Sequence, residues 1–419
     1  MNIRTTANES GHQELRIGEP MSARQLNASI ARADGSGDLQ TRVNKMAAVA
    51  SAHAVAIDRE SRFPREAFDA ARAEHLLGLA VPRELGGEGI GVADIADVCY
   101  RLGQACASTA LIYAMHQTKV ACIVRHGLGS PWHRQLLRRL CTEQLLLASS
   151  TTEGQAGGDL RNSAAAVEGE ALITLERQAT VISYGAAADG IVTTARRVAD
   201  AASSDQVLVT FLKSDYTLDV LNGWDAFGMR GTCSSGFTLR ASGLREQILP
   251  DSYEKIHSHT MMPFAHLAWS SVWAGIATAA VGRARGFVRK AAYRAGGTMP
   301  PAAAHLTRAT ASLRTLRSLI AASLRRFEAA ASDHVALESI DFQTGMNMLK
   351  VNASELAIST VMNAMQASGI AGYRNDGEFS MGRHLRDILS SPIMISNDRI
   401  LANAATAALL GAAPTSLRD

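Results

Sequence analysis

The spacing of hydrophobic residues changes twice along this chain of 419 residues, and that change constrains the fold more than any other feature. Between residues 39 and 147 the apolar positions recur with helical spacing, as in "REAFDAARAEHLLGL". Residues 148–250 instead hold short runs such as "DQVLVTFLKSD", separated by Gly, Asp and Ser, which is typical of strands. Helical spacing returns over residues 251–419. The sequence therefore predicts an α+β, mostly α protein, with a β domain between two helical domains.

Composition and charge exclude several kinds of partner. The net charge is +3 with acids and bases interspersed, and no run of about 18 apolar residues is present, so we expect no nucleic-acid or membrane partner. The five cysteines are odd in number and lack C-x-x-C spacing, which predicts no disulfide framework, no metal site and a cytoplasmic protein. The polar residues 1–38 are expected to form a flexible leader.

Five segments, in order along the chain, resemble the acyl-CoA dehydrogenase family. "STTEGQAGGD" is similar to the family's T-E-P-G-A-G-S-D loop, and "ATVISYGAAADGIVTTAR" to its K-x-W-I-T-N-G stretch. "GMRGTCSSGFTL", "GIATAAVGRA" and "QASGIAGYRNDGEFSMGRHLRD" resemble later family segments. The resemblance runs from about residue 60 to 410. It implies an N-terminal helical domain, a β-barrel-like domain and a C-terminal four-helix bundle, usually as a tetramer with FAD between subunits.

A flavin ring needs hydrogen-bond donors at its polar edge and an apolar wall behind it. The resemblance assigns those roles to the loop "STTEGQAGGD", which is rich in hydroxyl groups and glycine, and to the segment "ATVISYGAAADGIVTTAR". A strand-ending turn would use the same residue types, so the loop alone leaves both interpretations open. The expected cofactor-binding residues here are Ser149, Thr151, Thr152, Gly157, Gly158, Ile182 and Ser183.

The dinucleotide part of FAD would meet residues nearer the C-terminus. Gln366, Gly369 and Ile370 lie where family members approach the dinucleotide of a neighbouring subunit. Arg294 is the candidate for the pyrophosphate contact, although the aromatic residue usual in that segment is missing. The cofactor is therefore expected to be FAD, with FMN or a reduced flavin supplied by a reductase as alternatives.

The carboxylate that removes the substrate α-proton in this family is absent from both of its usual positions. Counting eight residues on from Asp387 gives Ile395, and the second position, on the first helix of the bundle, is Ala265. Three other ionisable residues are candidates for a displaced base: His116, His266 and Asp398. Each also has a plain structural interpretation. The two histidines would be buried structural residues, and Asp398 would form a surface ion pair with Arg399.

The two histidines of "HSH" at 257–259 are predicted to lie in a solvated loop and to bind no metal ion. The bundle helices carry more apolar positions than one stripe needs, which predicts a homodimer or homotetramer.

The leading functional hypothesis is a flavin-dependent oxidoreductase that acts on an acyl thioester of CoA or of a carrier protein. The alternative is a flavin monooxygenase of the same fold that takes reduced flavin from a reductase and uses oxygen. A non-catalytic binding protein is the third possibility.

Overall fold

The computed structural model describes residues 38–153 and 162–410. The chain divides into two compact units, Met1–Arg42 and Val43–Asp419. In the first unit, the Asp38 carboxylate accepts a hydrogen bond from the Thr41 N–H at 2.7 Å and caps the first helix. The predicted leader, apart from Asp38, lies outside the described residues. The elements that follow belong to the second unit, in which α2 also ends.

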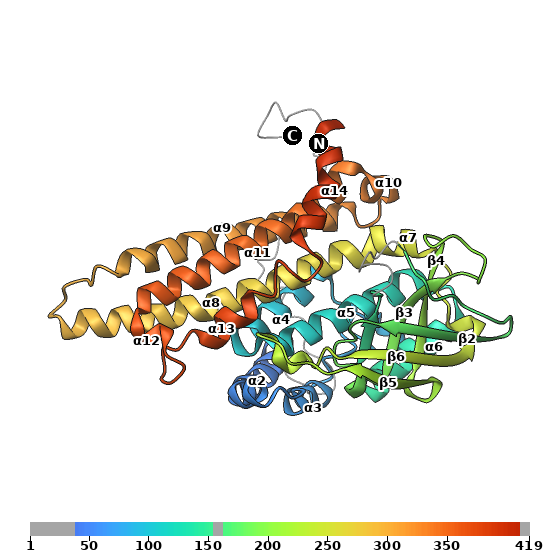
Figure 1. The fold of residues 1–419 in the computed structure, drawn as a ribbon, viewed down its shortest axis with the longest axis horizontal. Coiled ribbons are helices and arrows are strands. Elements are labelled where there is room, and N and C mark those ends of the chain that lie inside the picture. Colours follow the sequence, from blue (N-terminus) through green and yellow to red (C-terminus); the bar gives the residue numbers. More distant parts are fainter. Residues whose placement is uncertain (1–37, 154–161, 411–419) are drawn as a thin grey trace, which may run out of the picture. The chain divides into compact units, whose positions relative to one another are not determined.

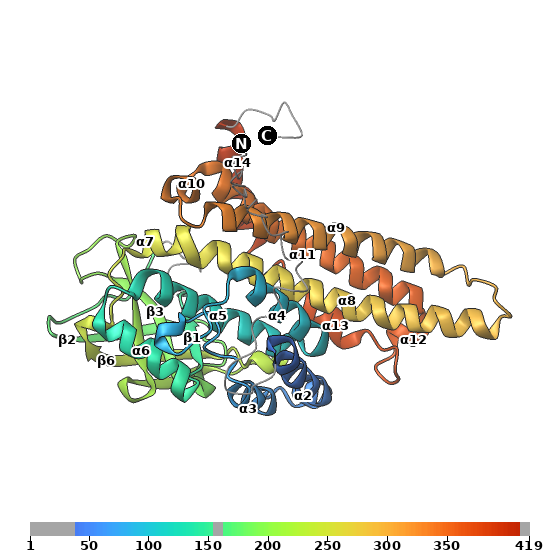
Figure 2. The same ribbon diagram turned by 180° about the vertical axis from the view of Figure 1, so that it is seen from behind.

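The N-terminal helical domain is built around one helix that is buried on every face. This helix, α5, lies between the strands and the long helix α8 when seen from either side (Figures 1 and 2). Its neighbour α6 starts where the Ser130 hydroxyl accepts the His133 N–H and a proline occupies the first turn. The helices are α2 (Leu39–Glu60), α3 (Arg65–Ala73), α4 (Val92–Ala105), α5 (Ala107–Gly127) and α6 (Pro131–Glu143).

Two three-stranded sheets follow, in the orders β1-β3-β4 and β2-β6-β5. The β1–β3 pair is parallel and the other pairs are antiparallel. Strand β2 alternates exposed and buried residues, as a strand with one wet face should, whereas β3 and β4 are buried along nearly their whole length. The strands are β1 (Leu147–Ser150), β2 (Leu172–Ala179), β3 (Gly190–Arg196), β4 (Gln206–Leu212), β5 (Tyr216–Asn222) and β6 (Gly236–Leu244).

The C-terminal part contains three long helices, α8, α9 and α11, of which α9 runs antiparallel to the other two (Figure 1). Helix α8 follows a π-helical turn, His257–Met261, so the "HSH" segment is not a solvated loop. By length and composition the stretch Tyr253–Arg294 is apolar enough to cross a membrane, but its most apolar part is 89% buried within the protein. The helices are α7 (Tyr253–Ile256), α8 (Met262–Arg294), α9 (Ala303–Ala330), α10 (His334–Glu338), α11 (Ile340–Ser368), α12 (Ile370–Tyr373), α13 (Gly382–Ile388) and α14 (Asn397–Leu410).

Close packing fixes α8 against the N-terminal helices. A Cβ atom on Gly103 of α4 would lie 2.5 Å from the Val272 carbonyl oxygen, and one on Gly275 of α8 would lie 2.3 Å from that of Tyr100. The two helices therefore approach so closely that only glycine fits at these positions. This contact places the first half of α8, which carries the site residues, against the N-terminal helical domain.

The R-x-x-R-D segment joins three parts of the second unit. Arg386 donates to Asp58 of α2 at 3.0 Å, and Asp387 accepts the Met229 N–H at 2.7 Å. A Cβ on Gly228 would lie 2.0 Å from the Arg386 carbonyl oxygen, so the loop passes very close to α13. These contacts hold the turn that follows α13, in which Ile395 lies.

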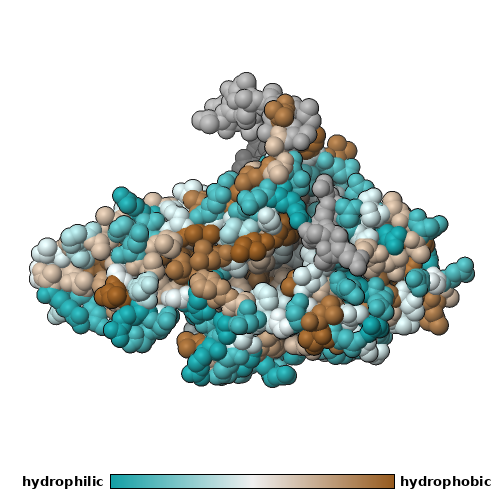
Figure 3. Space-filling view, in the orientation of Figure 1, coloured by the Kyte–Doolittle hydropathy of each residue, from teal (hydrophilic) through white to brown (hydrophobic). Residues whose placement is uncertain are grey.

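One face of α11 is only partly covered. Figure 3 shows hydrophobic side chains gathered over this helix. Ile358, Met362 and Met365 on α11 are partly exposed, and their spacing puts them on one face.

Candidate functional site

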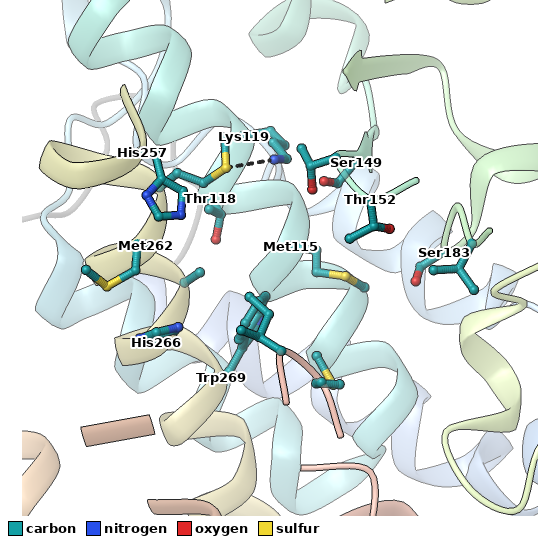
Figure 4. Close-up of a pocket in the computed structure, with 16 residues that line it drawn as sticks. Met115, Thr118, Lys119, Ser149, Thr152, Ser183, His257, Met262, His266 and Trp269 are labelled. Atoms are coloured by element: carbon teal, nitrogen blue, oxygen red, sulfur yellow. Dashed lines mark hydrogen bonds between the residues drawn. The ribbon is translucent and has the colours of Figure 1, made fainter. Parts of the chain in front are cut away.

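A cavity of about 210 Å³ lies where α5, the end of β1 and the start of α8 meet (Figure 4). It brings together residues that the sequence placed in separate motifs, from the hydroxyl loop to both usual base positions. The described residues that line it are Met115, Thr118, Lys119, Ser149, Thr151, Thr152, Val181, Ser183, His257, Met261, Met262, Ala265, His266, Trp269, Met394 and Ile395.

The hydroxyl groups expected at a flavin edge share one side of this cavity. Ser149, Thr151 and Thr152 line it, and their side chains make no hydrogen bond to any other residue that the structure describes. The Ser183 hydroxyl lies 2.8 Å from that of Ser234. No described residue therefore occupies the hydroxyl groups of the loop, which leaves them available to a ligand, as a flavin edge requires.

The other residues expected at the flavin ring are Ile182, Gly157 and Gly158. Ile182 is fully buried and absent from the cavity lining, because its neighbours Val181 and Ser183 point to the cavity and it points to the core. The Ile182 side chain therefore does not line this cavity, and its role in binding a flavin stays a prediction. Gly157 and Gly158 lie outside the described residues, and their role stays a prediction.

A buried ion pair anchors the loop that carries these hydroxyls. The Glu153 and Arg177 side chains lie 3.1 Å apart and are 3% and 0% exposed. Glu153 also accepts hydrogen bonds from the Ser163 hydroxyl and the Ala165 N–H, at 3.0 and 3.3 Å. Burial lowers the pKa of Arg177 to about 10, which leaves the guanidinium charged at neutral pH. Arg177 could not be identified from the sequence, because only the fold brings β2 to the loop.

Both usual base positions line the cavity and neither is ionisable. Ala265 comes from α8 and Ile395 from the turn after α13. Ile395 has a φ of 50°, in the left-handed region, and its carbonyl oxygen accepts a hydrogen bond from Lys350 at 2.6 Å. No described residue that lines the cavity is an aspartate or glutamate. Abstraction of an α-proton by a carboxylate therefore has no group to perform it among these residues.

Two of the three candidate replacement bases do not reach the cavity. His116 lies 2.9 Å from the Leu77 carbonyl oxygen through Nε2 and 3.1 Å from the Leu147 N–H through Nδ1, so backbone groups occupy both ring nitrogens. Burial lowers the pKa of His116 to about 4. Asp398 is exposed on α14 and does not line the cavity. The structure thus supports a structural role for His116 and gives no support for either residue as a base.

His266 is the candidate that lines the cavity. Its Nδ1 lies 3.1 Å from the Met346 carbonyl oxygen. A carbonyl only accepts, so Nδ1 carries the proton and Nε2 holds a lone pair. Nε2 is buried without a partner among the described residues, as is Nε1 of Trp269. Burial lowers the pKa of His266 to about 3, so the ring is a neutral hydrogen-bond acceptor and a weak base.

Lys119 is a charged cavity residue that was not predicted from the sequence. It lies on α5, one turn after Met115, and is 3% exposed. Its ammonium donates to the Met261 sulfur at 3.4 Å. Burial lowers the pKa of Lys119 to about 8. The signal was a single lysine in the otherwise uncharged helical run "ASTALIYAMHQTKVACIV".

The residues expected at the dinucleotide are far from this cavity within one chain. Gln366, Gly369 and Ile370 are exposed at the end of α11 and the start of α12. Arg294 is exposed at the last position of α8, 28 residues beyond His266, which is about 42 Å along a helix. A role for these residues toward a neighbouring subunit stays a prediction.

Other ionisable groups near the π-helical turn pair with one another. His259 is buried and lies 2.8 Å from the Glu338 carboxylate, and its ring stacks on that of His334 at 5.0 Å. The described part of the chain holds no group of three or more His, Cys, Asp and Glu side chains that could bind a metal ion.

The chain is similar in sequence to proteins of known activity. The family model "Acyl-CoA dehydrogenase, N-terminal domain" matches residues 37–144, and "Acyl-CoA dehydrogenase, C-terminal domain" matches residues 259–410. L-evernosamine nitrososynthase of Micromonospora sp. is 28% identical over 364 residues, 82% of this chain and 83% of that protein. Cyclohex-1-ene-1-carbonyl-CoA dehydrogenase of Syntrophus aciditrophicus is 25% identical over 359 residues, 83% of each protein.

The fold has solved counterparts. The FMN-bound structure of TdsC, a dibenzothiophene monooxygenase of a Paenibacillus species, superposes with a TM-score of 0.76 at 18% identity. That match covers 90% of this chain and 98% of the other. The α+β, mostly α fold class predicted from the sequence is therefore confirmed.

Proposed function

Since the chain belongs to the acyl-CoA dehydrogenase family and is a flavin-dependent oxidoreductase of that fold, we propose that it works as an oxygen-using flavin monooxygenase. The observation that carries this proposal is the cavity wall, in which Ala265 and Ile395 occupy the two base positions. Removal of a general base typically costs about 10²–10⁴ in rate, so ordinary α,β-dehydrogenation would be slow here. From the sequence, this monooxygenase function was the alternative, and oxidation of an acyl thioester was the leading hypothesis.

The residues on the hydroxyl side of the cavity fit a flavin ring. Ser149, Thr151 and Thr152 offer hydroxyl groups that no described residue uses, and Ser183 offers one more. When bound in reduced form, a flavin supplies the means to activate oxygen and to transfer one oxygen atom to a substrate. The likeness to an FMN-bound structure supports FMN, delivered by a reductase, and FAD would need Arg294 and Gln366 of a second subunit.

The remaining lining residues have roles that follow from their chemistry. Met262, Ala265 and Ile395 exclude water from the reacting atoms. The unpaired Nε2 of His266 accepts a hydrogen bond from an N–H or O–H group of the substrate. The L-evernosamine nitrososynthase among the relatives supports a substrate whose heteroatom is oxidised.

Acyl-thioester oxidation is the second candidate function. The likeness to a cyclohex-1-ene-1-carbonyl-CoA dehydrogenase over 83% of both chains favours it. Under this function the thioester is carried by CoA or by a carrier protein. His266, as the ionisable candidate that lines the cavity, would have to take the proton despite its low pKa.

Two measurements separate these functions. Under anaerobic conditions, protein loaded with oxidised flavin should not bleach with butyryl- or octanoyl-CoA. The protein should also bind reduced FMN more tightly than oxidised FMN, because a reductase must deliver the reduced form. Rapid bleaching by an acyl-CoA, together with tightly held oxidised flavin, would instead establish the dehydrogenase function.

We further propose that the protein acts in the cytoplasm as a homodimer or homotetramer. The free cysteines support a reducing compartment, because the five cysteines form no disulfide. The partly exposed apolar face of α11 supports self-association.

A further inference from the structure

Lys119 is a buried cation that has no oxygen partner among the residues that the structure describes. Its side chain reaches the cavity from α5 and is 3% exposed, yet the one described group that its ammonium bonds is the Met261 thioether, at 3.4 Å. Sulfur of this kind is a weak acceptor, and an ammonium group has three protons to donate. A buried charge that is not paired or hydrogen-bonded destabilises a protein strongly. The buried ammonium of Lys119 therefore destabilises the protein, and a ligand with a good hydrogen-bond acceptor would remove that destabilisation.

The other described residues that line the cavity do not neutralise this charge. The ionisable side chains among the described lining residues are Lys119, His257 and His266, all of them basic. Met115, Met261, Met262 and Met394, with Trp269 and Ile395, make up the apolar remainder of the wall around them. The cavity thus combines one fixed cation with a flexible apolar surface.

The lysine also lies apart from most of the hydroxyl side of the cavity. In Figure 4, Thr152 and Ser183 lie on the strand side, while Lys119 extends from α5 beside Ser149. The hydroxyl side is the expected flavin edge. The α5 and α8 walls, including the ammonium, are left for the substrate.

We propose that Lys119 binds an anionic oxygen group, a carboxylate or a similar oxyanion, on a substrate whose remaining body is apolar. This proposal rests on the proposed function for the position of the flavin, and it deepens that function by naming the substrate class. The charged amine would pair with the anion in a desolvated site, where such hydrogen bonds are stronger than in water. With a pKa of about 8, the amine is mostly charged at neutral pH and ready to bind an anion.

The test measures binding to the flavin-free protein and needs no turnover. Hexanoate and its neutral isostere hexanamide are titrated calorimetrically into the wild type, Lys119→Met and Lys119→Arg. We expect the wild type to prefer the carboxylate at least tenfold, Lys119→Met to lose the preference, and Lys119→Arg to keep most of it. Lys290→Met, at an exposed lysine that pairs with Glu378, is the matched control and should behave as wild type. The preference should also fade as the pH rises through about 8, because the amine loses its charge.

Equal binding of acid and amide by the wild type would overturn the proposal. So would a carboxylate preference that survives in Lys119→Met. A separate arm measures oxidised and reduced FMN affinity in the same variants. If Lys119→Met weakens flavin binding and leaves the carboxylate preference unchanged, the lysine serves the flavin and the proposal is wrong. If the wild type prefers the carboxylate but does not consume oxygen when given reduced flavin, the proposed monooxygenase function is wrong. The role of Lys119 in binding an anion would still stand.

Discussion

The ammonium group of Lys350 lies 2.6 Å from the carbonyl oxygen of Ile395, and the backbone of Ile395 is left-handed, with a φ of 50°. A β-branched residue rarely adopts this conformation, which costs on the order of 1–3 kcal/mol. Lys350 also donates to the Asn397 side-chain oxygen at 2.6 Å, and Asn397 donates in turn to Ser354. A buried lysine on α11 thus holds in place the turn that occupies the usual base position.

We expect Lys350→Met to destabilise the protein. The substitution keeps the length of the side chain but leaves the Ile395 and Asn397 oxygens without their donor. Each unsatisfied buried acceptor costs about 1–3 kcal/mol, partly offset because the buried charge is removed. The free energy of unfolding, measured with urea, should fall by about 1–3 kcal/mol. The exposed Lys290→Met variant should change it by less than about 0.5 kcal/mol, and an equal loss in both variants would contradict the role of Lys350.

Ile395→Glu should introduce some dehydrogenase activity. A carboxylate at this position would face the apolar wall formed by Ala265 and Met262, which raises the pKa of a carboxyl group and suits a general base near neutral pH. Glutamate is also unbranched at Cβ, so it tolerates the left-handed backbone better than isoleucine. We expect slow anaerobic bleaching of bound flavin by octanoyl-CoA in this variant. Ile395→Gln, of the same shape without the base, should show none. Fast bleaching in the wild type would mean that a base exists elsewhere.

Thr152→Ala and Ser183→Ala should each weaken flavin binding about two- to tenfold. Each removes a hydroxyl group at the expected flavin edge, and one hydrogen bond contributes about 0.5–1.5 kcal/mol. Fluorescence titration with FMN measures the effect. The control is Thr142→Ala, a loss of a hydroxyl on the exposed face of α6. If both cavity variants bind flavin like the parent, the hydroxyl loop is not the flavin edge.

Asp387→Asn should stabilise the protein at neutral pH. Burial raises the pKa of Asp387 to about 6 from an unfolded value of 3.8, so the native state holds the proton more tightly. Its contribution to the free energy of unfolding therefore falls as the pH rises between these two values, and the loss is complete above about pH 6. Asparagine keeps the acceptor for Met229 and carries no charge. We expect a gain of about 1–3 kcal/mol at pH 7.5 and a smaller gain at pH 5, from urea unfolding. A gain that is the same at both pH values would exclude titration of Asp387 as the cause.

Charges on the partly exposed face of α11 should break up the assembly. Ile358→Glu combined with Met362→Glu places two carboxylates on a face that we expect to be covered by a second subunit. Light scattering should show the mass of a dimer or tetramer for the wild type and a smaller mass for the double variant. Asn352→Lys, on an exposed position of the same helix, is the control. A wild-type mass equal to the monomer at all concentrations would refute the oligomer.

Much of the fold was predictable because the spacing of hydrophobic residues along the sequence follows the repeat of the helix or strand that they form. The change from helices to strands near residue 147, and back near residue 250, matches α6, β1, β6 and α7. The site was predictable only in part. Ser149, Thr152 and Ser183 were found from their motifs, as were the apolar base positions Ala265 and Ile395, and all five line one cavity.

The residues that were missed owe their roles to burial by distant segments. Lys119, Arg177 and Lys350 become unusual only when α5, β2 and α11 are packed, because a lysine or arginine in a helix or strand is ordinarily solvated. His116 illustrates the same point in the opposite direction. Its motif position was suggestive, but the backbone of Leu77 and Leu147, far away in sequence, takes both of its nitrogens.

The π-helical turn His257–Met261 determines which side chain at the start of this helical segment faces the cavity. Such a turn accommodates one residue more than an α-helical turn, and each residue advances an α-helix by about 100°. Loss of one codon within the turn would rotate His257 by about that angle relative to His266, while the register of α8 stayed as it is. A single-residue deletion could thus replace the basic group at this end of the wall without any substitution. Insertion and deletion, as well as mutation, are therefore routes by which this backbone can acquire a different substrate.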